Sequence, residues 1–308
     1  MRILKQVISL FLTLSLSFST LANFTELQSF GANPGSLEAS YFTPQPQSSA
    51  LVVLLHGCAQ NGEQLAQQSG LLGLAKQQKF ALLVPQQGLS NNIKRCFNWY
   101  SADDYTKDQG ESLSIKNMIT TLQKQILAEK IYIIGLSAGG AMTSSMLVNY
   151  PDLFTAGAVV AGIPFPCADG LITAISCMKN GPSQTVAELV SLTKKINLEQ
   201  KEWPKLSVWT GDADEIVNPL NSSSLAKQWA KLLRITTKPT VFDKAGYTIS
   251  QWKNTKHQVQ VELVKVIKRG HGIMVNPNEE NGGEVSDYLL ASSVSTVKHV
   301  ARFWEITQ

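Results

Sequence analysis

A serine between two glycines is the first place in this sequence where covalent chemistry can be expected. Residues 135–139 read Gly-Leu-Ser-Ala-Gly, a G-x-S-x-G pattern centred on Ser137. An apolar run at 131–134 precedes the motif, and a helical pattern follows it as far as Asn149. This strand–turn–helix setting, more than the short motif itself, predicts a nucleophile exposed on a sharp turn at the edge of a sheet.

Ser137 needs a base, and the chain contains four histidines, His56, His257, His271 and His299. The expected chain order for such a site is serine, acid, histidine, which excludes the first of the four. The second and the fourth have the sequence surroundings of exposed side chains. His271 follows the last predicted strand and lies between two glycines, so we predict it to be the base.

The acid that orients this histidine is expected on the loop after the preceding strand. Residues 209–217 contain three carboxylates in that place. Asp214 fits the Gly-x-x-Asp-x-x-Val pattern and is the predicted acid, whose task is to hold the histidine tautomer and stabilise the imidazolium. Asp212 is the alternative, with a structural hydrogen bond to the loop backbone as its other expected role.

Negative charge that develops on the substrate needs backbone donors, which form an oxyanion hole. One donor is expected to be the amide of Ala138, directly after the nucleophile. The other is expected in the loop after the early strand, which reads Leu-His-Gly-Cys-Ala-Gln over 55–60. Cys58 is placed to donate its amide there, and His56 then has a structural role.

The elements that must position these groups alternate between short apolar runs and helical patterns. This alternation predicts an α/β fold, and with the nucleophile motif an α/β-hydrolase: a mostly parallel sheet with helices on both faces. An insertion with one helix is expected over 163–204. The predicted strands cover 37–42, 51–55, 80–84, 131–134, 156–160, 206–209 and 259–267, and the predicted helices 64–78, 114–127, 139–149, 223–233 and 292–304.

The first residues have the layout of a secretory signal peptide. Arg2 and Lys5 precede an apolar run at 7–18, and small residues then place a cleavage site near Ala22. A membrane anchor is the alternative, but the run is too short to span a bilayer comfortably, so no stable membrane insertion is expected. We therefore predict a secreted protein with a single catalytic domain over 23–308.

Composition indicates a globular protein and gives no sign of nucleic-acid binding. The chain has 308 residues, of which 44% are hydrophobic, enough for a full core. The formal net charge of +4 gives no reason to expect nucleic acid as a partner.

Four cysteines, an even number in an exported chain, indicate disulfides, and three pairings are possible. The close spacing of Cys167 and Cys177 favours a local bridge between them, which leaves Cys58 with Cys96. A metal site is not expected, because neither a CxxC nor a histidine-rich spacing is present.

Several segments together resemble the extracellular polyhydroxybutyrate depolymerase family, which is related to secreted feruloyl and acetylxylan esterases. The resemblance spans about 35–305. The segments are His56-Gly57-Cys58-Ala59-Gln60, Cys96-Phe97-Asn98-Trp99-Tyr100, Gly135–Met142, Trp209–Val217 and Gly270-His271-Gly272.

The resemblance implies a serine hydrolase that cuts poly(3-hydroxybutyrate) or its oligomers without a cofactor. It implies Ser137, Asp214 and His271 as the triad, Cys58 as an oxyanion donor, and the same two disulfides. In many members of the family the histidine loop continues with an aromatic residue and a proline, whereas here it continues Gly-Ile-Met over 272–274, which predicts a different rim.

Two other functions remain open at this point. A feruloyl or acetylxylan esterase would use the same triad, and a non-catalytic binding protein of this fold would normally have lost part of it. Trp99, Tyr100, Trp203 and Trp209 are candidates for contact with the polyester or oligoester substrate, although packing in the core is an equal expectation for each.

Overall fold

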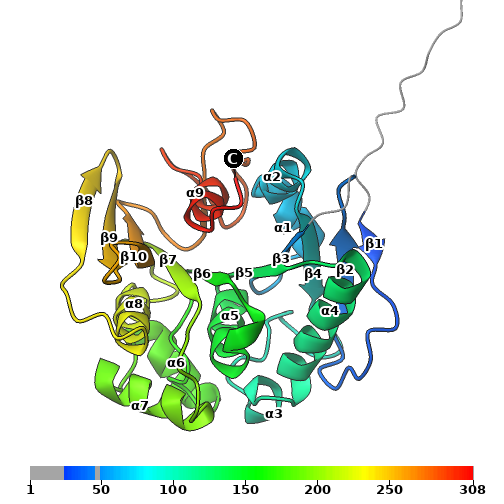
Figure 1. The fold of residues 1–308 in the computed structure, drawn as a ribbon, viewed down its shortest axis with the longest axis horizontal. Coiled ribbons are helices and arrows are strands. Elements are labelled where there is room, and N and C mark those ends of the chain that lie inside the picture. Colours follow the sequence, from blue (N-terminus) through cyan, green and yellow to red (C-terminus); the bar gives the residue numbers. More distant parts are fainter. Residues whose placement is uncertain (1–23, 46–48, 308) are drawn as a thin grey trace, which may run out of the picture.

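The structure is a computed structural model that describes residues 24–45 and 49–307, and the predicted signal peptide therefore lies outside the described residues. Its centre is a ten-stranded sheet with helices on both faces (Figure 1). The strands of this sheet are β1 (Thr25–Glu26), β2 (Glu38–Phe42), β3 (Ala50–Leu55), β4 (Ala81–Gln86), β5 (Lys130–Leu136), β6 (Ala156–Val160), β7 (Lys205–Gly211), β8 (Thr240–Lys244), β9 (Tyr247–Lys253) and β10 (Val259–Val266).

The strand order is β1-β2-β4-β3-β5-β6-β7-β10-β9-β8. The six strands from β4 to β10 run parallel, and only the outer strands on each side pair antiparallel. This arrangement confirms the predicted α/β-hydrolase class. Strands buried on both faces carry continuous apolar runs, which is why β3 and β5 are visible in the sequence.

Two hydrophobic cores fill the space on either side of the sheet. Along β3, Leu51, Val53 and Leu55 belong to one core, and Val52 and Leu54 belong to the other, as the twofold alternation of a strand requires. The first face is covered by α4 (Gly110–Ile126), α5 (Ala138–Asn149) and α8 (Leu220–Leu232), and the second by α2 (Leu71–Gln78) and α9 (Thr296–Phe303) (Figure 1).

Helices are present at the predicted ranges with shifted ends, and the short helix at Ala102–Tyr105 lies where a loop was expected. They are α1 (Gly62–Gln68), α2 (Leu71–Gln78), α3 (Ala102–Tyr105), α4 (Gly110–Ile126), α5 (Ala138–Asn149), α6 (Leu171–Asn180), α7 (Val186–Ile196), α8 (Leu220–Leu232) and α9 (Thr296–Phe303), with a 3-10 turn at Pro151–Leu153. The insertion over 163–204 contains two helices, α6 and α7, where one was predicted.

The single helix predicted over 64–78 is in fact two helices, α1 and α2. Gly70 separates them with φ +84°, a left-handed conformation in which glycine is not strained. A Cβ at this position would lie 2.3 Å from the Asn281 carbonyl oxygen, so the C-terminal segment approaches closely there. Asn281 is more than 200 positions from Gly70 in the sequence. The local sequence pattern of 64–78 therefore could not indicate that the helix is interrupted at Gly70.

Five further strands were not predicted, and the first of them is the two-residue β1. β8 and β9 form an antiparallel hairpin at one edge of the sheet, where β8 is exposed along its whole length. β11 (Ile273–Val275) and β12 (Leu289–Ala291) form a separate parallel pair after the predicted base. β11 buries Ile273 and Met274, and the difference in the rim expected from 272–274 stays a prediction.

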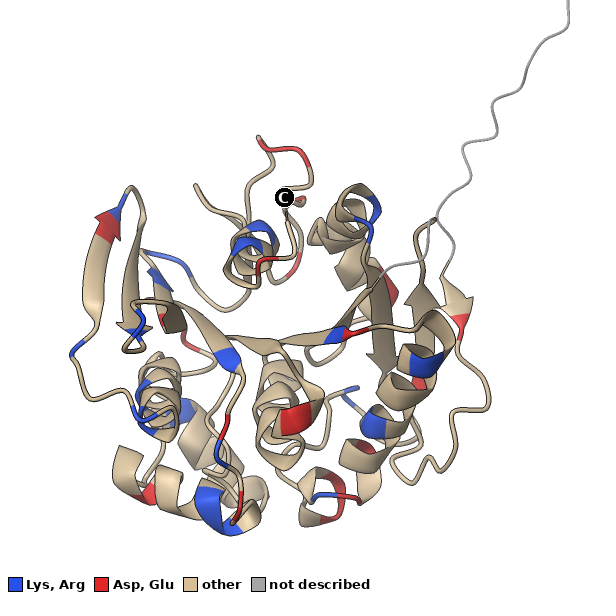
Figure 2. Cartoon of the chain, viewed as in Figure 1, with Lys and Arg blue, Asp and Glu red and all other residues tan. Residues whose placement is uncertain are grey.

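Acidic and basic residues are interspersed over several helices (Figure 2). Among residues 24–45 and 49–307, no helix has the length and apolar character that a membrane crossing requires.

Candidate active site

The predicted reactive residues all follow the carboxyl ends of parallel strands. Cys58 follows β3, Ser137 follows β5, Asp214 follows β7 and His271 follows β10. These strands are neighbours in the sheet apart from β6, which lies between β5 and β7. Ligand sites of open α/β sheets form at this edge, so residues separated by more than 200 positions share one end of the sheet.

Ser137 occupies a strained turn between β5 and α5. Its backbone has φ 57° and ψ −118°, a conformation that non-glycine residues rarely adopt. The turn is tight because α5 starts directly against β3: a Cβ at Gly139 would lie 2.3 Å from the Leu55 carbonyl oxygen. Glycine at this position lets the helix approach the sheet, and Ser137 is left half-buried at the wall of a pocket.

Asp214 and His271 form a direct pair. The Nδ1 atom of His271 lies 2.8 Å from Oδ2 of Asp214, whose side chain is fully buried. The other carboxylate oxygen, Oδ1, accepts hydrogen bonds of 2.9 Å from the backbone N–H groups of Ile216 and Val217. The carboxylate is therefore fixed by its own loop and can hold the imidazole in one orientation.

Asp212, the alternative acid, has a different environment. It is exposed, and its Oδ1 accepts a hydrogen bond of 2.6 Å from the Lys268 backbone N–H. This contact ties the loop after β7 to the loop after β10. The contact is the structural role that the sequence suggested for Asp212.

A pocket of about 130 Å³ brings the predicted nucleophile, base and oxyanion loop together. Ser137, His271 and Cys58 all line it. The other lining residues are Gly57, Gln60, Leu136, Met178, Ile216 and Tyr288.

Three side chains of this lining were missed by the sequence analysis. Met178 comes from α6, Ile216 from the acid loop, and Tyr288 from the segment before β12. The Tyr288 ring stands edge-on to the His271 ring, with centroids 6.0 Å apart. No motif marks these residues, although Ile216 lies within the loop that was singled out for its carboxylates.

The loop after β3 leaves one backbone amide without a hydrogen-bond partner among the described residues, and that amide belongs to Cys58, which lines the pocket. The N–H of Gly57 donates to Oε1 of Gln60, and the N–H of Ala59 donates to the Lys94 carbonyl. Between them, the N–H of Cys58 has no hydrogen-bond partner within the part of the chain that the structure describes. Ala138 is the first residue of α5, and the N–H groups of a first helical turn have no partner inside the helix.

His56 is a buried structural residue, as predicted. Its Nε2 accepts a hydrogen bond of 3.0 Å from the Gln87 backbone N–H, and Nδ1 lies 2.7 Å from the Gly57 carbonyl, to which it donates. The donor at Nδ1 and acceptor at Nε2 fix one neutral tautomer. Burial lowers the pKa of the His56 imidazole from 6.5 to about 4.

This low pKa predicts a pH-dependent loss of stability. As the pH falls from about 6.5 to about 4, the unfolded chain binds a proton at His56 while the folded chain does not, so the free energy of unfolding decreases. The difference corresponds to about 3 kcal/mol over this window. Urea unfolding at pH 7 and pH 4.5 should show a steeper decrease for the wild type than for His56→Gln. Equal decreases in the two proteins would contradict the prediction.

Two of the tryptophan candidates for substrate contact belong to the core, which was the other expectation for each. Trp209 is 1% exposed, and its indole N–H donates to the Ser207 hydroxyl inside the sheet. Trp203 is buried edge-on against Trp229. The prediction of Trp209 as a substrate contact was wrong because every residue of β7 from Leu206 to Gly211 is buried between two helix layers.

Trp99 and Tyr100 have a more open position. Both are half-buried, and their rings contact edge to face with centroids 5.6 Å apart. They pack beside the small apolar cluster that contains Cys167 and Cys177, and they are not among the residues lining the Ser137 pocket. Their contact with substrate stays a prediction.

The prediction that His299 is a solvated surface residue was wrong. Its ring lies 3.2 Å from the carboxylate of Glu262, a buried residue of β10, and edge-on to Trp209. The residue is on α9, and the amphipathic pattern of that helix did not reveal which charged group faces it. His257, by contrast, is exposed in the turn between β9 and β10, as predicted.

Both predicted disulfides are present. Cys58 is bonded to Cys96, and Cys167 is bonded to Cys177. The first joins the loop after β3 to the loop after β4, and the second closes the start of the insertion onto α6. Disulfides persist in oxidising compartments, which agrees with the predicted export.

Comparison with known proteins identifies the family. The model of the family described as "Esterase PHB depolymerase" matches residues 39–252. The chain belongs to this family. The resemblance drawn from the motifs is therefore confirmed, and the match contains the loop after β3, the elbow and the acid loop, while His271 lies beyond its end.

Relatives of this esterase PHB depolymerase family member include enzymes with different named substrates. Poly(3-hydroxyalkanoate) depolymerase C of Paucimonas lemoignei is 33% identical over 95% of this chain and 72% of its own length. Feruloyl esterase B of Talaromyces stipitatus is 31% identical over 74% of this chain and 66% of its own length. An acetyl xylan esterase from Aspergillus awamori has the same fold, with a TM-score of 0.77 at 20% identity over 92% of this chain and 100% of its own.

Proposed function

We propose that this protein is a secreted serine esterase that hydrolyses poly(3-hydroxybutyrate) or its oligomers. The observation that carries the proposal is the pocket that contains Ser137, His271 and Cys58, with His271 held by the buried Asp214. We further propose that residues 1–22 are removed on export and that 23–308 act as one catalytic domain.

The proposed reaction proceeds through an acyl-enzyme. Because Nδ1 of His271 is engaged by Asp214, Nε2 takes the proton of Ser137 as its hydroxyl attacks the ester carbonyl. The amides of Cys58 and Ala138 stabilise the oxyanion of the tetrahedral intermediate. His271 then protonates the leaving alcohol, and water, activated by the same imidazole, releases the 3-hydroxyacyl group.

Apolar side chains around the pocket support a polyester as substrate. Met178 and Ile216 line the pocket. On α6, Leu171, Ile172 and Ile175 are 58%, 84% and 50% exposed and lie on the helix that carries Met178. An uncharged polymer with methyl side groups presents matching apolar surface, whereas a xylan chain is covered with hydroxyl groups.

A feruloyl or acetylxylan esterase is the second candidate. Feruloyl esterase B and acetylxylan esterase A match this chain over 74% and 83% of its length, at 31% and 26% identity. The proposed triad chemistry is the same for all these esters, because the acyl group does not take part in the proton transfers.

The experiment that separates the candidates offers three substrates to the protein purified from Asn23 onward. These are amorphous poly(3-hydroxybutyrate), methyl ferulate and acetylated xylan, each with Ser137→Ala as the blank. We expect serine-dependent release of 3-hydroxybutyrate or its oligomers, with little turnover of the other two. Turnover only of ferulate or acetyl esters would replace the polyester substrate while keeping the proposed triad.

A further inference from the structure

The loop that carries the Cys58 amide is held from one side by a single neighbouring loop. This neighbour, residues 87–98, connects β4 to the region of α3 and contains no helix or strand. Loop 87–98 contacts the oxyanion loop at three points. The Gln87 N–H donates to His56, and the Lys94 carbonyl accepts from the Ala59 N–H. The third contact is the disulfide between Cys96 and Cys58. The position of the Cys58 amide therefore depends on the position of loop 87–98.

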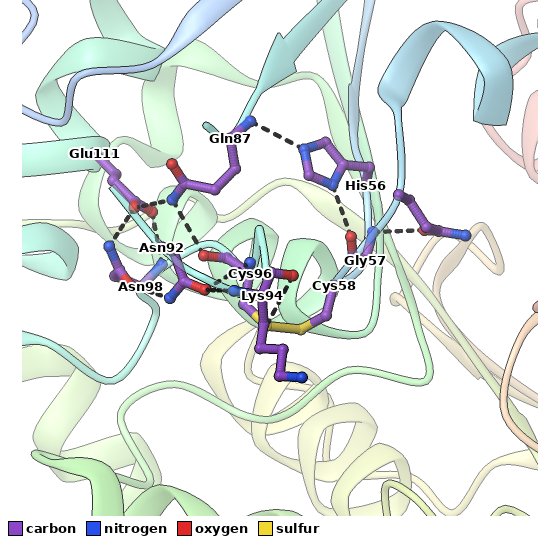
Figure 3. The surroundings of a disulfide bond; sticks show 10 residues. His56, Gly57, Cys58, Gln87, Asn92, Lys94, Cys96, Asn98 and Glu111 are labelled. Carbon is purple, nitrogen blue, oxygen red and sulfur yellow. Dashed lines mark hydrogen bonds between the residues drawn. A yellow bond between two sulfur atoms is a disulfide. The ribbon is translucent and has the colours of Figure 1, made fainter. Parts of the chain in front are cut away.

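Loop 87–98 is in turn organised around the carboxyl group of Glu111. Oε1 of Glu111 accepts from Nε2 of Gln87 at 2.5 Å, from Nδ2 of Asn98 at 2.8 Å and from Nδ2 of Asn91 at 3.3 Å. Oε2 accepts from the backbone N–H of Asn98 at 2.8 Å. Figure 3 shows the carboxyl group on one side of this network and the Cys58–Cys96 disulfide on the other.

Gln87 and Asn98 connect the Glu111 carboxyl to Cys96 through further hydrogen bonds. Nε2 of Gln87 also donates to the Cys96 carbonyl at 3.1 Å. Oδ1 of Asn98 accepts from Asn92, whose own Oδ1 accepts from the backbone N–H of Cys96. Both backbone groups of Cys96 are thus fixed by side chains that connect to Glu111.

Glu111 itself is buried at the start of α4. It is 0% exposed and is the second residue of α4, where the helix dipole favours negative charge. Burial raises the pKa of its carboxyl to about 8, while the hydrogen bonds from Asn98 and Gln87 act in the opposite direction. A carboxyl has acceptor sites on both oxygens, which the donors of loop 87–98 require.

We propose that Glu111 is a positioning residue for ester hydrolysis, which fixes the Cys58 amide of the oxyanion hole through loop 87–98 and the Cys58–Cys96 disulfide. The inference rests on the proposed function, because it assigns Glu111 a role in that reaction. Glu111 does not line the pocket, so its effect falls on the oxyanion donor and not on substrate binding. Displacement of one donor weakens transition-state stabilisation and leaves ground-state binding nearly unchanged.

The test compares Glu111→Gln with Glu262→Gln, a matched control. Glu262 is a second buried carboxyl, which accepts from the Ser207 hydroxyl at 2.7 Å and pairs with His299, but it has no contact with loop 87–98. Both oxygens of the Glu111 carboxyl accept hydrogen bonds from loop 87–98. A glutamine side chain replaces one of these oxygens by an NH2 group, which cannot accept, so at least one hydrogen bond to the loop is lost in either amide orientation. Both variants place a neutral amide where a buried carboxyl stood.

The measurements are kcat and KM on soluble 4-nitrophenyl butyrate and the melting temperature, with Ser137→Ala as the blank. For Glu111→Gln we expect kcat to fall tenfold to about a hundredfold, less than the roughly 10²- to 10³-fold loss on removal of an oxyanion donor, with KM within about twofold. Glu262→Gln is expected to lower the melting temperature but to keep kcat within about threefold.

The inference is overturned if both variants lose kcat equally, or if Glu111→Gln changes KM alone. If Glu111→Gln does not fold, Asn98→Ala tests the inference instead. This variant removes the hydrogen bond from the Asn98 side chain to the Glu111 carboxyl. We expect its kcat to fall threefold to about tenfold at constant KM. An unchanged kcat in Asn98→Ala would then refute the inference. Wild-type protein without serine-dependent turnover would instead refute the proposed function.

Discussion

Replacement of Ser137 by alanine should abolish nearly all ester hydrolysis. We expect kcat to fall by about 10⁴-fold or more with a similar KM, since the pocket and the oxyanion donors remain and only the nucleophile is lost. The variant should also fail to react with a fluorophosphonate, which labels an activated serine. Because Ser137 is at a strained backbone position with φ 57°, alanine there is not expected to stabilise the fold.

Ser144→Ala is the matched control for this experiment. Ser144 lies on the same helix, α5, and its hydroxyl is buried and donates to the Gly140 carbonyl at 3.3 Å. We expect this variant to keep both turnover and fluorophosphonate labelling. A loss of less than a hundredfold in Ser137→Ala would mean that the G-x-S-x-G serine is not the nucleophile.

The second large effect is expected for Asp214→Asn. The asparagine amide can keep the hydrogen bonds from Ile216 and Val217, so the loop should stay in place. Its NH2 group would, however, face Nδ1 of His271. Because the NH2 group donates, Nδ1 has to accept, and the imidazole then carries its proton on Nε2. That tautomer cannot take the proton of Ser137, and kcat at neutral pH should fall by about 10⁴-fold.

Asp212→Asn tests whether this effect is specific. Asp212 is two residues earlier in the same loop, and its exposed carboxylate accepts only the Lys268 N–H at 2.6 Å among its side-chain hydrogen bonds to described residues. An asparagine oxygen can accept the same bond, so we expect kcat within about threefold of wild type. If Asp212→Asn lost more activity than Asp214→Asn, the assignment of the acid would have to be exchanged.

The sequence by itself determined the fold class and the order of the reactive groups. Parallel strands covered on both faces must be continuously apolar, so β3, β5 and β6 were visible as runs, and the turns after them could be located. Carboxyl ends of parallel strands meet at one edge of a sheet. Residues 137, 214 and 271 could therefore be predicted to share a site without knowledge of any contact between them.

Only the tertiary structure decided which side chains face the pocket and which face the core. β7 is buried on both sides, so no alternation along its sequence could show that Trp209 points into the core. The contact of His299 with Glu262 joins α9 to β10, and the Tyr288 ring reaches His271 from a segment with no periodic pattern. Each of these contacts depends on how two elements pack, which local sequence does not encode.

The hydrogen-bond network around Glu111 is the clearest example of contacts that the local sequence does not encode. A glutamate in the first turn of a helix has the sequence appearance of a solvated residue, yet Glu111 is fully buried. Its burial follows from the packing of loop 87–98 over the start of α4, and that packing is fixed by hydrogen bonds between residues 13 to 24 positions apart together with the disulfide. The sequence predicted Cys58 as an oxyanion donor, but the structure alone identifies the residues that hold its loop in place.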